Sequence, residues 1–330
     1  MKKTMLAAVA ALGMMTGAAF AQYPEKEIQG VIQWGAGGST DVVMRSITPH
    51  AEKILGQKVV MQNVTGGVGA IGLNKAADAA ADGYTLLMGA ENPLLYKVMG
   101  LGQKDYSDFV PINIIARGTP IIVARKDAPF NTFAEMLDYI GKHPRAVKFG
   151  STGPGGVPSV VTAMINSVTP IQVTAVPYDG DGPALTALQG GAIDVLPAVM
   201  GAALENIRAD RIKAIAIFDT KGNDALPGVK PVTEVNKGFE KFLPWGPFFG
   251  IFVKKGTPEQ AAQKLSAAYG EAAKNPDFVK MIEGRSFTIL NLSGRPAEDF
   301  LRKWQSGTTW LLQDAGVAKN SPEKFGIPKP

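Results

Sequence analysis

The chain has 330 residues, of which 45% are hydrophobic and 19% charged, and its formal net charge is +5. This length suits one large core or two domains of about 100–200 residues each, and we expect two. Lysines and arginines are scattered among acids along the whole chain, which argues against nucleic-acid binding. With no cysteine and only two histidines, a Cys/His zinc site and cysteine-based catalysis are excluded, and we expect no metal and no cofactor.

The first residues have the features of a secretory signal. Lys2 and Lys3 give a basic start, residues 5–15 form an apolar stretch too short to span a bilayer, and Ala19-Phe20-Ala21 fits the small-x-small cleavage rule. We therefore predict a signal peptide over residues 1–21, a mature chain that begins at Gln22, and location in the periplasm. No later segment is apolar for long enough to predict a transmembrane helix.

Short β-rich runs then alternate with glycine loops and helical patterns. The pattern predicts strands over 28–34, 58–64 and 84–88, and helices from Ser39 to Leu55 and over 70–81. In the first helix the residues at helical spacing, which we expect to be buried, are Val43, Ile47, Ala51 and Ile54. Strands that alternate with helices indicate an α/β fold with parallel or mixed sheets covered on both faces.

The character of the chain changes at two apolar segments, over 110–124 and 245–253, which we interpret as crossovers between two lobes. Lobe 1 is then discontinuous and consists of residues 22–120 and 246–330, and lobe 2 consists of residues 121–245. In lobe 2 we predict strands over 147–151, 172–176, 193–196 and 213–217 and helices over 133–140, over 157–167 and from residue 184. After Pro258 the chain is predicted to be helical to about residue 315, apart from 287–290.

Glycine-rich turns between a strand and a helix direct backbone N–H groups and the positive end of the helix dipole at one spot, which favours an anion. The loops Gly35–Asp41 and Gly153–Val157 have this form and lie in different predicted lobes. Acidic and aromatic residues at strand ends border the same expected cleft. The residues that we predict to bind a ligand are Trp34, Gly37, Gly38, Ser39, Thr40, Asp41, Glu91, Ser151, Thr152, Gly153, Gly155, Gly156, Tyr178 and Asp179.

The acids in this set also have structural interpretations. Asp41 can cap its helix, while Asp179 and Asp181 can form hydrogen bonds within turns. We favour the turn interpretation for Asp181 and leave Asp179 and Glu91 open, since either could repel an extra carboxylate or receive an amine.

Two other functions are conceivable. Residues 67–72 match G-x-G-x-x-G, with Glu91 about twenty residues on, as in dinucleotide-binding folds. Several residues separate that fingerprint from the preceding strand, however, and no acid–base partner accompanies it. An exported hydrolase that uses Ser151 or Ser39 is the main alternative, but His50 and His143, the only histidines, are both expected in structural or surface positions.

Several motifs together resemble the Bug-type substrate-binding proteins of tripartite tricarboxylate transporters, in order from Tyr23 to Gly316. The segments that carry the resemblance are residues 23–28, 35–41, 55–57, 66–69, 82–87, 150–155, 176–178, 182–184, 191–194, 245–250 and 256–258. The resemblance implies a type II-like periplasmic binding fold whose two lobes, joined by two crossover strands, close on a ligand. It also implies that loops 37–41 and 151–156 hold a carboxylate through backbone amides, hydroxyls and ordered water.

The resemblance further implies delivery of the solute to a membrane permease with a large and a small subunit, and we expect the receptor to be a monomer. This sequence departs from the family at three places, with Gln33-Trp34 before the first loop, Pro158-Ser159 where a His is common, and Asp179 where Lys or Gly is usual. Each departure removes positive or neutral character. We therefore expect a small organic acid, with an aromatic, zwitterionic or less charged solute as an open choice.

Overall fold

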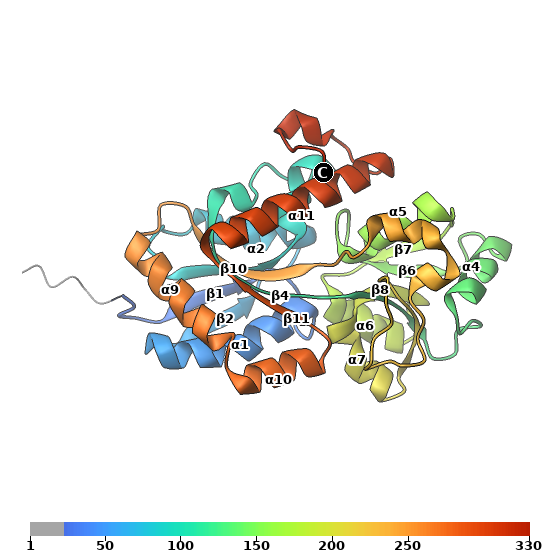
Figure 1. Ribbon diagram of the computed structural model, residues 1–330, viewed down its shortest axis with the longest axis horizontal. Coiled ribbons are helices and arrows are strands. Elements are labelled where there is room, and N and C mark those ends of the chain that lie inside the picture. The colour runs from blue at the N-terminus through green and yellow to red at the C-terminus, as the bar shows by residue number, and fades with distance from the viewer. Residues whose placement is uncertain (1–22) are drawn as a thin grey trace, which may run out of the picture.

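The computed structural model describes residues 23–330, so the predicted signal peptide lies outside the described residues (Figure 1). The strands form one six-stranded and one five-stranded sheet. In order across the first sheet the strands are β11 (Thr288–Leu292), β4 (Phe109–Arg117), β10 (Phe248–Lys254), β3 (Thr85–Ala90), β1 (Ile28–Ile32) and β2 (Val59–Asn63). In order across the second sheet they are β7 (Thr174–Pro177), β6 (Lys148–Ser151), β8 (Val195–Val199), β5 (Pro120–Arg125) and β9 (Ile212–Ile217).

Both sheets are mixed, as the alternation of strands and helices predicts. In the first sheet β1 pairs in parallel with β2 and β3, while β10 runs antiparallel between β3 and β4. In the second sheet β6 is parallel to β7 and β8, and β5 is antiparallel to β8 and β9. The parallel strands of each sheet therefore place their carboxyl ends, where ligands bind in open α/β sheets, at one edge.

Helices cover the faces of both sheets. In Figure 1 the first sheet lies on the left with α1, α2 and α9, and the second lies on the right with α4 to α7. Among residues 23–330, no helix has both the length and the hydropathy needed to cross a lipid bilayer. The helices are α1 (Ser39–Leu55), α2 (Ala70–Asp78), α3 (Tyr96–Met99), α4 (Phe133–Lys142), α5 (Val157–Val168), α6 (Asp181–Gln189), α7 (Met200–Arg208), α8 (Val232–Val235), α9 (Glu259–Ala272), α10 (Pro276–Gly284) and α11 (Gly294–Asp314).

Helix α1 shows how the sequence determines one of these elements. Its face of Val43, Ile47 and Ala51 is buried, as its spacing predicts, but Ile54 is 44% exposed and Leu55 takes the last buried position. The helix ends where Gly56 adopts a left-handed conformation (φ 73°), which glycine reaches without steric cost, and its N–H donates to the carbonyl of Glu52.

The chain passes from the first sheet to the second between β4 and β5 and returns before β10. These two connections are in contact, because the N–H of Gly118 donates a 2.9 Å hydrogen bond to the carbonyl of Pro247. The approach is close enough that a Cβ on Gly246 would lie 2.1 Å from the carbonyl oxygen of Gly118. The sheets thus contain the residues predicted for the two lobes, while the lobe boundaries at residues 120 and 245 stay predictions.

Candidate functional site

A narrow cavity lies where the two sheets face each other. Its volume is about 30 Å³, room for about two or three water molecules. The walls come from the carboxyl ends of β1, β3, β6 and β8, the loop before α6, and the segment that enters β10. The lining residues are Trp34, Gly38, Ser39, Thr40, Ala90, Glu91, Asn92, Thr152, Val157, Gly180, Asp181, Val199, Pro247 and Phe249.

Three helices begin at this cavity: α1, which packs against the first sheet, and α5 and α6, which pack against the second. The N-caps of α1, α5 and α6 are Gly38, Gly156 and Gly180, and none of the three helices has a side-chain capping hydrogen bond. The first N–H groups of a helix have no partner within the helix, and together with the helix dipole they attract an anion. The cavity therefore combines uncapped helix starts from both sheets.

The two sheets also touch each other around the cavity. The N–H of Gly35 donates to the carbonyl of Asp179 at 2.9 Å, and the amide Nδ2 of Asn92 donates to the carbonyl of Gly155 at 3.0 Å. A Cβ at Gly182 would lie 2.1 Å from the carbonyl oxygen of Ala36, so only glycine permits this approach. A solute larger than a few water molecules must separate these contacts or displace side chains.

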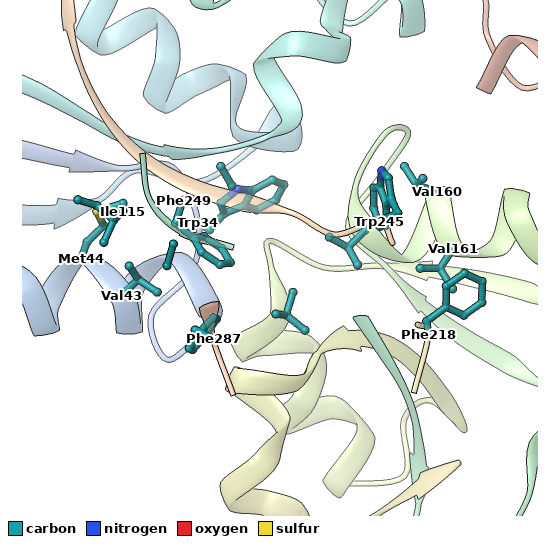
Figure 2. Close-up of a cluster of buried hydrophobic side chains, with 14 of the residues drawn as sticks. Trp34, Val43, Met44, Ile115, Val160, Val161, Phe218, Trp245, Phe249 and Phe287 are labelled. Atoms are coloured by element: carbon teal, nitrogen blue, oxygen red, sulfur yellow. The ribbon is translucent and has the colours of Figure 1, made fainter. Parts of the chain in front are cut away.

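Aromatic side chains form part of the wall. Figure 2 shows Trp34, from the loop after β1, beside Phe249 of β10, and both rings are buried. Figure 2 also places Trp245 farther along the connection, near Val160 of α5. Trp245 lies outside the cavity, and its indole N–H donates a 3.0 Å hydrogen bond to the hydroxyl of Thr308.

The charged groups in the wall are both acidic. Burial, and to a smaller extent the charge of Asp181, raises the pKa of Glu91 from 4.5 to about 8. Asp181 is partly exposed as a residue, but the packing around its carboxyl group raises its pKa to about 6, against the lowering effect of the hydrogen bond from Ser39. Among the described residues, no Lys, Arg or His lines the cavity.

Six of the predicted binding residues meet in this cavity, namely Trp34, Gly38, Ser39, Thr40, Glu91 and Thr152. The other eight lie beside it or outside it, namely Gly37, Asp41, Ser151, Gly153, Gly155, Gly156, Tyr178 and Asp179. Whether these residues bind a solute stays a prediction, but the loops predicted to converge do share one cavity.

The residues outside the cavity have local roles. Asp41 forms an ion pair with Arg45 at 2.7 Å and accepts a hydrogen bond from the N–H of Gly37. The hydroxyl of Ser151 accepts a hydrogen bond from the N–H of Gly153 at 3.1 Å. The side chain of Asp179 is exposed, and it contacts the hydroxyl of Thr65 at 3.4 Å.

The interpretation of Asp181 as a turn residue is wrong. Asp181 lines the cavity, and its carboxylate accepts a hydrogen bond from Ser39, which begins a helix of the other half. Gly180, with φ 115°, separates it from the exposed Asp179. Seven further residues of the wall were not predicted from the sequence, namely Ala90, Asn92, Val157, Gly180, Val199, Pro247 and Phe249. Val157 and Gly180 lie where their loops meet helices, which is a signal that could have identified them.

The glycine fingerprint has a packing role instead of a place in the cavity. A Cβ on Gly72 would lie 2.8 Å from the carbonyl oxygen of Val64, so this helix packs tightly against the preceding strand. The carbonyls of Val68 and Gly69 accept hydrogen bonds from Tyr96 and Gln33. The two histidines do not support hydrolysis either, since within residues 23–330 neither lines the cavity beside Ser39, and His143 is exposed and stacked on Tyr139.

Comparison with known proteins agrees with this architecture. A structure titled periplasmic binding protein BugD superposes with a TM-score of 0.85 and is 26% identical, covering 90% of this chain and 100% of BugD. MatC from Rhodopseudomonas palustris, solved with bound malate, gives a TM-score of 0.79 at 26% identity, covering 88% of this chain and 100% of MatC. BugT of Bordetella pertussis is 29% identical over 284 residues, 85% of this chain and 86% of BugT. The predicted periplasmic binding fold is thus confirmed.

The sequence model of one family also matches most of the chain. It spans residues 43–315 and is described as the tripartite tricarboxylate transporter family receptor. The resemblance to Bug-type proteins is therefore confirmed, and with it the role of a transport-associated solute-binding protein rather than a hydrolase. This chain belongs to the tripartite tricarboxylate transporter receptor family.

Proposed function

We propose that this receptor binds a small organic acid in the cavity between its two sheets and delivers it to the subunits of a membrane permease. The observation that carries the proposal is the meeting of three uncapped helix starts, α1, α5 and α6, at one cavity between two sheets. A solute that contacts both halves favours their closed arrangement because it binds that arrangement better. The receptor acts by capture and release, without catalysis.

Malate bound to MatC supports a carboxylate as the group that these helix starts hold. In this chain Ser39, Thr40 and Thr152 line the same cavity, and the hydroxyls of Thr40 and Thr152 can add hydrogen-bond donors. Export through the N-terminal signal, with cleavage after residue 21, would bring the receptor to the periplasm, where it acts as a monomer.

Titration calorimetry and thermal shift on the mature chain test this proposal, after native mass spectrometry for a co-purified solute. We expect a carboxylic acid to bind and to raise the melting temperature with increasing concentration. Replacing Thr152 with Val keeps the side chain's shape but removes its hydroxyl, and we expect it to weaken binding about tenfold.

The matched control is Thr186→Val, because Thr186 is exposed on α6 and its hydroxyl donates to the carbonyl of Gly182, outside the cavity. Equal affinities in Thr152→Val and in the wild type would contradict the placement of the site. The absence of any bound carboxylic acid, in the purified protein and in titration alike, would contradict the function itself.

A further inference from the structure

Glu91 is a buried acid, and one of its carboxyl oxygens has no hydrogen-bond partner within the described residues. It follows β3 directly, it is only 2% exposed, and it is one of the residues that line the cavity. Within the described residues its Oε2 has no hydrogen-bond partner, although buried carboxyl oxygens are nearly always paired. A solute in the cavity that Glu91 lines could supply the missing partner of this buried oxygen.

A second acid strengthens the negative character of this space. Asp181 lies in the wall of the same cavity, and its charge acts on the Glu91 carboxyl. The hydrogen bond from Ser39 satisfies one oxygen of Asp181 but brings no positive charge. Since no cationic side chain of residues 23–330 lines the cavity, two carboxyl groups stand there without a counter-ion.

The rest of the wall suits a molecule that carries both signs of charge. The faces of aromatic rings such as Trp34 and Phe249 attract cations, and both rings border the cavity. The uncapped starts of α1 and α5 attract an anion instead. A dicarboxylate would satisfy the helix starts but would bring a further negative charge towards Glu91 and Asp181, where like charges repel.

We infer that the solute is a small zwitterion, whose carboxylate binds at the uncapped starts of α1 and α5 and whose cationic nitrogen pairs with Glu91. This inference rests on the proposed function, because it names the class of acid that the same cavity binds. Glu91 then determines specificity, because a cationic nitrogen beside its carboxyl group favours the ionised form of that group, whereas a second carboxylate on the solute disfavours it.

A matched set of four-carbon probes tests the inference by calorimetry at pH 7.5, with butyrate, 4-aminobutyrate and succinate, followed by the three- and six-carbon sets. We expect that at one chain length the amino acid binds at least tenfold more tightly than both the monocarboxylate and the dicarboxylate. In Glu91→Gln, which keeps the shape of the side chain but cannot ionise, the amino acid should lose at least tenfold in affinity and the dicarboxylate should gain.

Two further variants keep the result interpretable. Glu205→Gln is the matched control, because Glu205 is exposed on α7 and pairs with Arg208, and it should leave all affinities unchanged. If Glu91→Gln fails to fold, the same affinities are measured in Asp181→Asn. This variant should also reduce the preference for the amino acid over the dicarboxylate.

The outcomes separate the two proposals. A dicarboxylate that binds most tightly, and keeps its affinity in Glu91→Gln, would overturn the zwitterion while the function as a receptor stands. If no probe of any class binds and no solute co-purifies, the proposed function fails, and this inference fails with it.

Discussion

The hydroxyl of Ser39 donates a 2.8 Å hydrogen bond to the carboxylate of Asp181, across the junction of the two sheets. Ser39 begins α1 and Asp181 begins α6, so this bond joins two helix starts that belong to different halves of the protein. Because the bond is direct and lies in the cavity wall, changes at either residue should affect closure and ionisation together.

Replacing Ser39 with Ala removes the donor that stabilises the charged form of Asp181. We expect the pKa of Asp181 to rise above its value of about 6 and the contact between the halves to weaken by about 1 kcal/mol. NMR titration of the labelled aspartate carboxyl groups measures the pKa. Ser46→Ala is the control on the same helix, because the hydroxyl of Ser46 donates to the carbonyl of Val42 within α1. An unchanged pKa of Asp181 in Ser39→Ala would contradict the role of this bond.

Replacing Gly182 with Ala should hold the two halves apart. The new Cβ would stand 2.1 Å from the carbonyl oxygen of Ala36, and main-chain atoms cannot yield without a shift of the whole loop. We expect weaker solute binding and a larger radius of gyration by small-angle scattering, with little loss of stability within each half. Gly141→Ala is the matched control, since nothing lies within 4 Å of the Cβ at that position. A variant as compact as the wild type would contradict this account.

The stability of the protein should depend on pH through Glu91. Its pKa is raised from 4.5 to about 8, so between these values the folded protein keeps a proton that the unfolded chain releases. The contribution of Glu91 to the free energy of unfolding is therefore largest below the lower value and falls as the pH rises, by about 1.4 kcal/mol per unit and by a few kcal/mol in all. Asp181 acts in the same direction up to about pH 6, and the nearby phenols of Tyr96 and Tyr106 have raised pKa values and stay neutral.

Urea unfolding at pH 4, 5, 6, 7 and 8 measures this dependence. In Glu91→Gln the side chain carries no proton to lose, so we expect a flatter profile and a variant more stable than the wild type at pH 8. Asp181→Asn should instead flatten the profile below pH 6. Parallel profiles for Glu91→Gln and the wild type would show that the carboxyl group ionises as freely in the folded protein as in water.

Trp34 should report the arrival of a solute. It is the one tryptophan of the described chain that lines the cavity, whereas Trp245, Trp304 and Trp310 line a separate outer groove. We expect a solute to change the tryptophan emission of the wild type and of Trp310→Phe, and this change to disappear in Trp34→Phe. Calorimetry on Trp34→Phe confirms that the solute still binds. A full emission change without Trp34 would place the solute elsewhere.

The sequence was sufficient to predict the convergence of the glycine loops around Gly38 and Thr152. Within each sheet the parallel strands end at one edge, so the loops that follow them gather there, and the resemblance to two-lobed binding proteins implied that these two edges face each other. The error at Ile54 has a local cause, since positions three and four residues after Ala51 are both compatible with one helix face, and packing selects Leu55.

The remaining cavity residues could not be predicted from local pattern. Pro247 and Phe249 belong to the returning connection, and their place in the wall depends on how the two sheets face each other. Asp181 was misassigned for a related reason. An acid in a turn can accept a hydrogen bond within that turn or from another helix. Which of the two it does depends on its neighbours in the folded protein, and for Asp181 the neighbour is Ser39.

The hydrogen bond between Gly118 and Pro247 ties the outgoing and the returning connections to each other. Since the two segments cannot bend independently, we expect one half to pivot against the other about a single axis. The distance between any surface point of one half and any surface point of the other then depends on this one pivot angle. We therefore expect that a membrane partner in contact with both halves would distinguish the solute-bound receptor from the free one without touching the solute.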